Sequence, residues 1–138
     1  MKTIAFIGAG NMGGALARAA CRAIDPKEVV IYEPNAAAAA ALAEETGCIA
    51  AASGAEAVRA AKYVVLCVKP QVLPGVLNGL IPALKDGIAA GEHLVLVSIA
   101  AGVQLATLAG ILAAGGVELP TVRIMPNTPA SIGEGVLL

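Results

Sequence analysis

A glycine-rich segment near the start of the chain restricts the possible folds more than any other feature. Residues 2–7 form a short apolar run typical of a buried strand, and Gly8, Gly10 and Gly13 follow with the spacing G-x-G-x-x-G. In such a turn the first glycine permits the bend, the second admits a pyrophosphate, and the third lets helix and strand pack closely. The helix N-terminus then offers free N–H groups to the phosphates. Placed between a strand and a helical pattern, the motif predicts dinucleotide binding by Gly8, Ala9, Gly10, Asn11, Met12 and Gly13.

Short apolar runs alternate with helical segments along the rest of the chain. Strands are expected at residues 2–7, 28–32, 48–51, 63–68, 94–98 and 121–124. Helices are expected at residues 11–23, 35–46, 54–61, 73–84 and 103–112, with Pro82 ending or kinking the fourth. This alternation predicts an α/β fold of Rossmann type, with a doubly wound, mainly parallel sheet, right-handed crossovers and helices on both faces.

The composition restricts the class of protein further. A chain of 138 residues has room for one ordinary domain, residues 1–138, but not for two. Hydrophobic residues make up 58% of it, yet Gly, Pro or charged residues break every apolar stretch before the ~18 residues that a membrane span needs. Buried parallel strands explain the hydropathy better. A net charge of −1 and an aromatic content of 2% exclude a nucleic-acid-binding surface.

The remaining composition argues against several kinds of site. No charged amino-terminal region precedes a long apolar core, so we expect no signal peptide and a cytoplasmic protein. Cys21, Cys48 and Cys67 lie far apart among apolar residues and are expected to be buried free thiols. The single histidine, His93, precedes the fifth strand at the opposite end of the sheet from the other motifs. We therefore expect neither a metal site nor a Ser/His/Asp triad.

Glu33 ends the second predicted strand, twenty residues after Gly13. An acidic residue at this place commonly accepts hydrogen bonds from the adenosine ribose, and its charge would repel a 2′-phosphate. No Lys or Arg stands between Glu33 and Ala41 to hold such a phosphate. The segment therefore favours NAD over NADP. The alternative is a solvated glutamate at a strand end.

Three loops of unusual composition follow the fourth, fifth and sixth predicted strands. They are Val68-Lys69-Pro70-Gln71, Ser98-Ile99-Ala100-Ala101-Gly102 and Met125-Pro126-Asn127-Thr128-Pro129. Ligands of open α/β sheets bind outside the carboxyl ends of the strands, so these loops are expected near the glycine loop. Lys69 is a candidate for an anionic group, or a plain surface lysine. Asn127 and Thr128 supply an amide and a hydroxyl, or form a turn that satisfies its own backbone.

Together these segments resemble the amino-terminal domain of pyrroline-5-carboxylate reductase. The resemblance covers the whole chain and rests on residues 6–12, 68–71, 98–103 and 123–129. The first segment would fit many dehydrogenases, whereas the last three in this order are specific. The resemblance implies cofactor contacts at Gly8, Ala9, Gly10, Asn11, Met12, Glu33, Pro34, Val68, Lys69, Pro70, Ala100, Ala101 and Gly102. It also places the loop containing Asn127 and Thr128 beside the nicotinamide and substrate pocket, where Lys69 is a further candidate.

The activity that the resemblance implies is the last step of proline biosynthesis. A hydride passes from NADPH, the usual donor in this family, or from NADH to the C=N carbon of 1-pyrroline-5-carboxylate, giving L-proline. Two alternatives remain at this point. One is another reductase of the 6-phosphogluconate-dehydrogenase-like type, such as a β-hydroxyacid dehydrogenase or a hydride transferase between cofactors. The other is a non-enzymatic module that senses NAD(P).

The sequence departs from the resemblance in two respects. Gly54 stands where many family members have an asparagine that contacts the cofactor. The all-helical second domain of the family, which forms the homo-oligomer and much of the substrate site, has no counterpart here. Because Val136–Leu138 is an apolar run typical of the start of another strand, we expect the natural protein to continue. The chain alone is expected to bind cofactor but not to catalyse the reaction.

Overall fold

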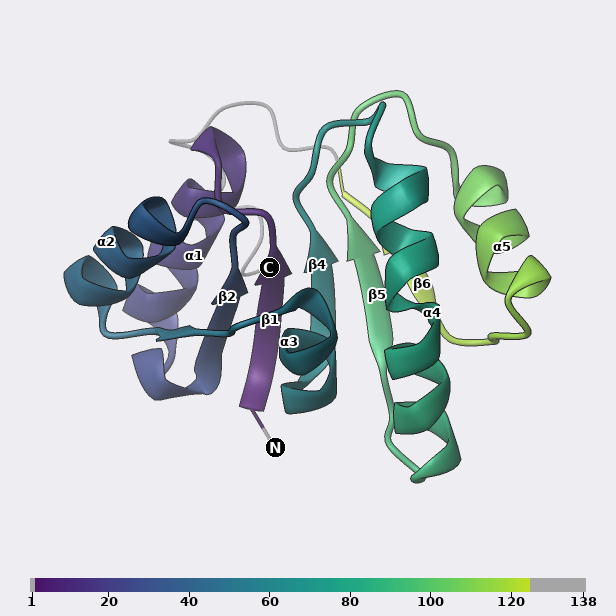
Figure 1. The fold of residues 1–138 in the computed structure, drawn as a ribbon, viewed down its shortest axis with the longest axis horizontal. Helices are drawn as coiled ribbons and strands as arrows, with labels where there is room; N and C mark the ends of the chain where they lie inside the picture. The colour runs from purple at the N-terminus through teal and green to yellow at the C-terminus, as the bar shows by residue number, and fades with distance from the viewer. Residues whose placement is uncertain (1, 125–138) are drawn as a thin grey trace.

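The computed structural model describes residues 2–124 and shows a six-stranded parallel sheet (Figure 1). The strand order is β3-β2-β1-β4-β5-β6, and every neighbouring pair is parallel. This is the order of a dinucleotide-binding fold, in which the chain reverses direction across the sheet between β1 and β4. The predicted Rossmann-type, doubly wound α/β fold is therefore confirmed.

The bounds of the elements follow the predicted alternation closely. The strands are β1 (Lys2–Ile7), β2 (Val29–Tyr32), β3 (Ile49–Ala50), β4 (Ala61–Leu66), β5 (Val95–Ser98) and β6 (Thr121–Arg123). The helices are α1 (Asn11–Ala23), α2 (Ala36–Thr46), α3 (Gly54–Ala60), α4 (Leu73–Ala89) and α5 (Leu105–Ala114), with a 3-10 turn η1 (Pro26–Glu28). None of these helices is long and apolar enough to cross a membrane.

Alternation along the strands divides the core between the two faces of the sheet. Ala5 and Ile7 of β1 pack on the face that α3, α4 and α5 cover, whereas Phe6 packs with α1 and α2 on the other face. Figure 1 shows α3 and α4 in front of the sheet and α1 and α2 on its other side. The central strands are covered on both faces, which explains why they read as continuous apolar runs.

The second face is covered over only part of its width. In the part of the chain that the structure describes, α1 and α2 cover β1 and β2 and bury Val65 of β4 on that side, but they leave β5 and β6 less covered, with Val122 44% exposed. A hollow of about 280 Å³ lies there. Its lining is apolar apart from the tyrosine hydroxyl and consists of Ile4, Phe6, Leu16, Tyr63, Val65, Val95, Val97, Ile99, Val122 and Ile124.

Two details differ from the expectations. Helix α4 does not end at Pro82 but continues to Ala89. Pro82 is exposed, so water can reach the carbonyl that its missing N–H leaves unpaired, while Ile81, Ala83 and Leu84 hold the helix on the core. The three cysteines are free thiols, but only Cys48 is fully buried; Cys21 and Cys67 are half-buried.

Candidate functional site

The glycine turn joins β1 to α1 at the carboxyl edge of the sheet. Gly8 has φ +94°, a left-handed conformation that residues with a side chain rarely adopt, and its N–H donates to the Tyr32 carbonyl over 2.8 Å. At Gly13 a Cβ would overlap the Gly8 carbonyl oxygen. Gly8 and Gly13 are therefore required by the protein's own packing.

Gly10 differs from the other two glycines. A Cβ at this position would meet no heavy atom within 4 Å, and its φ of −70° suits any residue. Gly10 is the N-cap of α1, supplies no capping side chain, and no acidic residue lies in the first helical turn. The N–H groups at the start of α1 therefore face open space, as an anion-binding helix N-terminus requires.

Glu33 joins the glycine turn to the turn after β2. Its Oε1 accepts a hydrogen bond from the N–H of Ala9 over 3.0 Å, and its Oε2 accepts one from the N–H of Asn35 over 2.9 Å. A carboxylate has about four acceptor positions, so two remain for hydroxyl donors. Pro34, which stands between Glu33 and Asn35, is exposed. Glu33 is therefore anchored beside the glycine turn and is not a freely solvated side chain.

A hollow of about 330 Å³ lies between the ends of β1, β4 and β5. Eight predicted site residues line it together with Cys67 and Ile99, and these eight are Gly10, Asn11, Met12, Val68, Lys69, Pro70, Ala100 and Ala101. Gly102 belongs to the same turn as Ala101, and its φ of +79° accounts for the glycine. The glycine turn and the loops after β4 and β5 thus line one hollow, whereas the third predicted loop, residues 125–129, falls outside the described residues.

Lys69 and Pro70 form the exposed rim of this hollow. The Lys69 carbonyl accepts hydrogen bonds from the N–H groups of Val72 and Leu73, over 3.0 and 3.1 Å, which fixes the loop against the start of α4. Within residues 2–124 the Lys69 ammonium has no hydrogen bond or ion pair. It is therefore free to meet an anionic group at the rim.

Three residues at the hollow were not singled out as site residues from the sequence, although Ser98 and Ile99 belong to a loop that was predicted there. Ser98 is fully buried, and its hydroxyl accepts a hydrogen bond from the Ala100 N–H over 3.3 Å, which shapes the Ala-Ala-Gly turn. Ile99 and Cys67 line the hollow. Burial raises the pKa of the Cys67 thiol to about 12, so the thiol stays protonated and is no nucleophile. The signals that the sequence offered were the places of Ser98 and Ile99 within the Ala-Ala-Gly loop and of Cys67 directly before Val68.

Some predicted residues lie elsewhere. Asn127 and Thr128 fall outside the described residues. His93 is exposed before β5, at the amino edge of the sheet. No group of three or more His, Cys, Asp or Glu residues that could hold a metal ion occurs between residues 2 and 124. Gly54 opens α3 at a distance from the hollow's lining, and a Cβ there would come within 3.0 Å of a Leu80 methyl.

The hollow between the loops suits a dinucleotide better than the hollow on the bare sheet face. The former has backbone donors at the start of α1 and a lysine at its rim. The latter is lined by apolar side chains and a tyrosine, with no group able to bind phosphate strongly. We therefore assign the candidate site to the carboxyl edge.

Comparison with known proteins agrees with this geometry. The family described as NADP oxidoreductase, coenzyme F420-dependent, matches residues 3–102. A pyrroline-5-carboxylate reductase from Pseudomonas aeruginosa is 42% identical over 133 residues, which are 96% of this chain and 45% of that protein. The Escherichia coli enzyme of the same name is 37% identical over 138 residues, covering 98% of this chain and 48% of that protein. This chain thus spans about half the length of these relatives.

Solved structures extend the similarity to the fold. A pyrroline-5-carboxylate reductase from Coxiella burnetii superposes with a TM-score of 0.80 at 26% identity, covering 95% of this chain and 46% of that one. A Plasmodium falciparum pyrroline carboxylate reductase with NADP bound gives 0.73 at 26% identity, covering 97% and 45%. The resemblance that the motifs indicated is therefore confirmed over nearly the whole chain.

Proposed function

This chain belongs to the NADP oxidoreductase, coenzyme F420-dependent family, and from that premise we propose that residues 1–138 are the cofactor-binding domain of a pyrroline-5-carboxylate reductase. The observation that carries the proposal is the convergence of three separate loops on one hollow at the carboxyl edge. The same three segments bear the motifs of the reductases. Relatives of that name also match this chain from end to end, at up to 42% identity.

Each part of the site has a defined task in this proposal. The bound cofactor supplies a hydride from its dihydronicotinamide ring to the C=N carbon of pyrroline-5-carboxylate, and a proton reaches the nitrogen, giving proline. The N–H groups at the start of α1 hold the pyrophosphate, and the missing side chain of Gly10 leaves room for it. The small residues Ala100 and Ala101 leave space for a flat ring beside Val68. The protein contributes orientation.

The substrate side of the site is proposed to lie partly outside the described residues. Asn127 and Thr128 are proposed to border the substrate pocket, with Lys69 as a partner for an anionic group. Because the chain spans 45 to 48% of the reductases named above, we propose that a further domain completes the substrate site and forms a homo-oligomer. The chain alone is then expected to bind cofactor without turnover. A cytoplasmic location remains a prediction from the sequence.

A second candidate reaction is hydride exchange between NADP and coenzyme F420, which the family's description names. That match ends at residue 102, whereas the similarity to pyrroline-5-carboxylate reductases covers 96% or more of the chain. We therefore favour imine reduction. Assaying the gene product against both acceptors separates the two reactions.

The test measures binding and turnover separately. Calorimetric titration of the 138-residue chain with NADH and with NADPH is expected to show one site for at least one of them. Gly10→Ala is expected to keep the fold, by circular dichroism, and to weaken binding about tenfold or more because the methyl occupies the pyrophosphate's place. The gene product at the relatives' length should oxidise the cofactor only when pyrroline-5-carboxylate is added. Absence of binding to both cofactors, or turnover with F420 alone, would contradict the proposal.

A further inference from the structure

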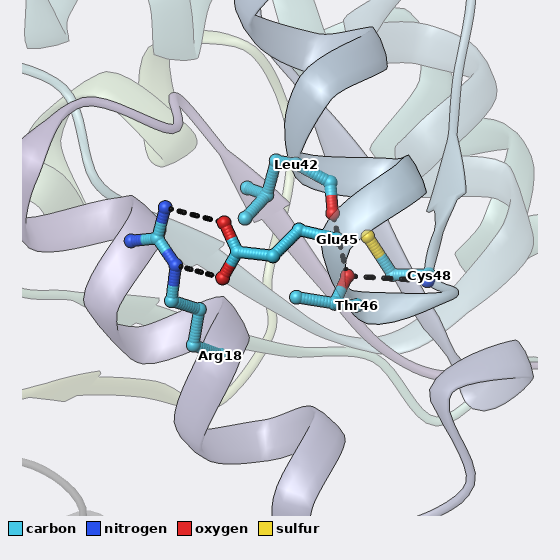
Figure 2. Close-up of polar contacts among 5 residues, drawn as sticks. All are labelled: Arg18, Leu42, Glu45, Thr46 and Cys48. Atoms are coloured by element: carbon cyan, nitrogen blue, oxygen red, sulfur yellow. Dashed lines mark hydrogen bonds and ion pairs between the residues drawn. The ribbon is translucent and has the colours of Figure 1, made fainter.

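Two of the three cysteines, Cys21 and Cys48, come together at the amino edge of the sheet, although twenty-seven positions separate them in the sequence. Helices α1 and α2 cover the same face and run in the same direction, because each leads from a parallel strand back to the amino edge. Arg18 of α1 donates to both carboxylate oxygens of Glu45 of α2, over 2.6 and 3.2 Å (Figure 2). Cys21 follows Arg18 by three positions and so lies on the same side of α1. Cys48 follows Glu45 by three positions, which places the two cysteines beside each other just beyond the ion pair.

The contacts of the two cysteines agree with this arrangement. Cys48 belongs to the apolar cluster under α1 and α2, and Cys21 packs against that cluster. Cys48 is 6% exposed, and its N–H donates to the Thr46 hydroxyl over 3.3 Å; that hydroxyl in turn donates to the Leu42 carbonyl over 2.8 Å (Figure 2). Cys21 is half-buried, and the side chains of Thr46 and Cys48 lie near enough to shift the pKa of its thiol. The two thiols are therefore neighbours, and Cys21 is the one that solvent reaches.

The surroundings of this thiol pair suit a neutral group better than a charged one. Burial raises the pKa of the Cys21 thiol above its ordinary value, and the Thr46 hydroxyl offsets only part of this effect. The thiol therefore stays mostly protonated at neutral pH and reacts slowly with an oxidant. A disulfide carries no charge and no hydrogen-bond donor, so it costs little to bury in an apolar cluster. A bond between the two sulfur atoms would thus form slowly and be well accommodated once formed.

We propose that Cys21 and Cys48 are an oxidation site, at which a small disulfide such as oxidised glutathione converts the two thiols into one disulfide bond. The Cys21 thiolate attacks one sulfur of the oxidant, which forms a mixed disulfide and releases a glutathione thiolate that takes up the Cys21 proton. The Cys48 thiolate then attacks the Cys21 sulfur and releases the second glutathione thiolate, which takes up the Cys48 proton. The two cysteines lose two electrons, and the oxidant is reduced to two thiols.

The bond ties the last turn of α1 to the segment that enters β3. It closes a loop over residues 21–48, which contains β2 and α2. A crosslink of this span removes conformations from the unfolded chain and so favours the folded one. The half of the domain that it stabilises is the half that carries the glycine turn and Glu33. Oxidation therefore protects the cofactor half against unfolding, whichever cofactor and substrate the protein uses.

The experiment incubates the 138-residue chain with oxidised glutathione for several hours and digests it with trypsin without reduction. Mass spectrometry should find peptide 19–22, which contains Cys21, linked to peptide 28–59, which contains Cys48. The oxidised chain should melt about 10 °C above the reduced chain, because the crosslink restricts the unfolded state. Dithiothreitol should reverse both the linkage and the shift in melting temperature.

Cys67→Ser is the matched control. Cys67 lines the hollow at the carboxyl edge, at the opposite end of the sheet, so this variant should still form the linked peptides and melt at a higher temperature once oxidised. Cys21→Ser should lose both effects. A bond to Cys67, a mixed disulfide at Cys21 that Cys48 does not displace, or no loss of free thiols in the unchanged chain would overturn the inference. None of these outcomes bears on the reductase proposal.

Discussion

The two halves of the sheet have similar apolar strands but very different surroundings. Around β1 and β2, helices cover both faces, and Val29 and Ile31 have no exposed surface. On the other side, α4 and α5 cover one face of β5 and β6, while Val122 stays 44% exposed on the face opposite. Valine residues in strands of the two halves are therefore buried to very different extents.

The two halves also differ in how much of their packing comes from the described residues. The half that holds the glycine turn and Glu33 has its packing and its polar partners within residues 2–124. The other half supplies Lys69 and the Ala-Ala-Gly turn from the ends of β4 and β5, on a sheet with one bare face. We infer that the pyrophosphate and adenosine part of the site is the more rigidly preorganised one.

The largest expected effect is the loss of stability when a methyl group is added at Gly13, the tightest contact of the glycine turn. Gly13→Ala should lower the free energy of unfolding by about 3 kcal/mol, because the new methyl overlaps the backbone of Gly8, which cannot move without distorting the turn. Urea denaturation followed by circular dichroism measures the loss. Gly10→Ala is the matched control in the same turn and should change stability by less than about 0.5 kcal/mol. Equal losses in the two variants would contradict the assigned glycine roles.

A matched pair of valines measures the difference between the halves directly. Val29→Ala in β2 should cost about 2 kcal/mol, since it deletes two buried methyl groups and leaves a cavity. Val122→Ala in β6 should cost less than about 1 kcal/mol, because nearly half of that side chain is already exposed. The same denaturation experiment compares them. A cost at Val122 as large as at Val29 would show that residues outside 2–124 cover the bare face.

The smallest expected effect concerns the ion pair that joins α1 to α2 (Figure 2). The hydrogen bond from Arg18 holds the pKa of the Glu45 carboxyl below its ordinary value of 4.5. A lowered pKa in the folded state contributes stability above pH 4.5, and this contribution disappears as the pH falls through the lowered value. Glu45→Gln should therefore be slightly less stable than the unchanged chain at pH 7.

The pH dependence provides the check on that prediction. Melting temperatures of the two proteins should converge as the pH is lowered past the Glu45 pKa, and the difference between them at pH 7 should shrink with added salt because the pair is exposed. Glu44→Gln on the same helix serves as the control and should show no such convergence. A difference between the unchanged chain and Glu45→Gln that persists at low pH would mean that the pair does not account for it.

Much of this molecule was predictable from local sequence. Alternating apolar runs and helical segments predicted six strands and five helices because each has its own periodicity. The glycine spacing predicted the turn and a helix beginning at Asn11, since Gly8 needs a positive φ and Gly13 has no room for a Cβ. Gly47, with φ +83°, ends α2 for the same local reason.

Other features depended on contacts between distant residues. The sequence placed Glu33 at a strand end but left open whether it was merely solvated. Only the folded chain brings it within 3.0 Å of the Ala9 N–H, twenty-four positions away. Likewise Pro82 was expected to end or kink its helix on local grounds, and the burial of its neighbours carries the helix past it to Ala89.

The sequence by itself therefore determined most of the elements of this protein and the glycine turn at which we propose that a pyrophosphate binds, because both follow from backbone conformation and short-range spacing. The tertiary structure alone decided how Ser98 shapes the Ala-Ala-Gly turn, how Glu33 is anchored and which strands stay exposed on one face. Those features are set by the order in which parallel strands assemble. That order brings together residues that no local pattern relates.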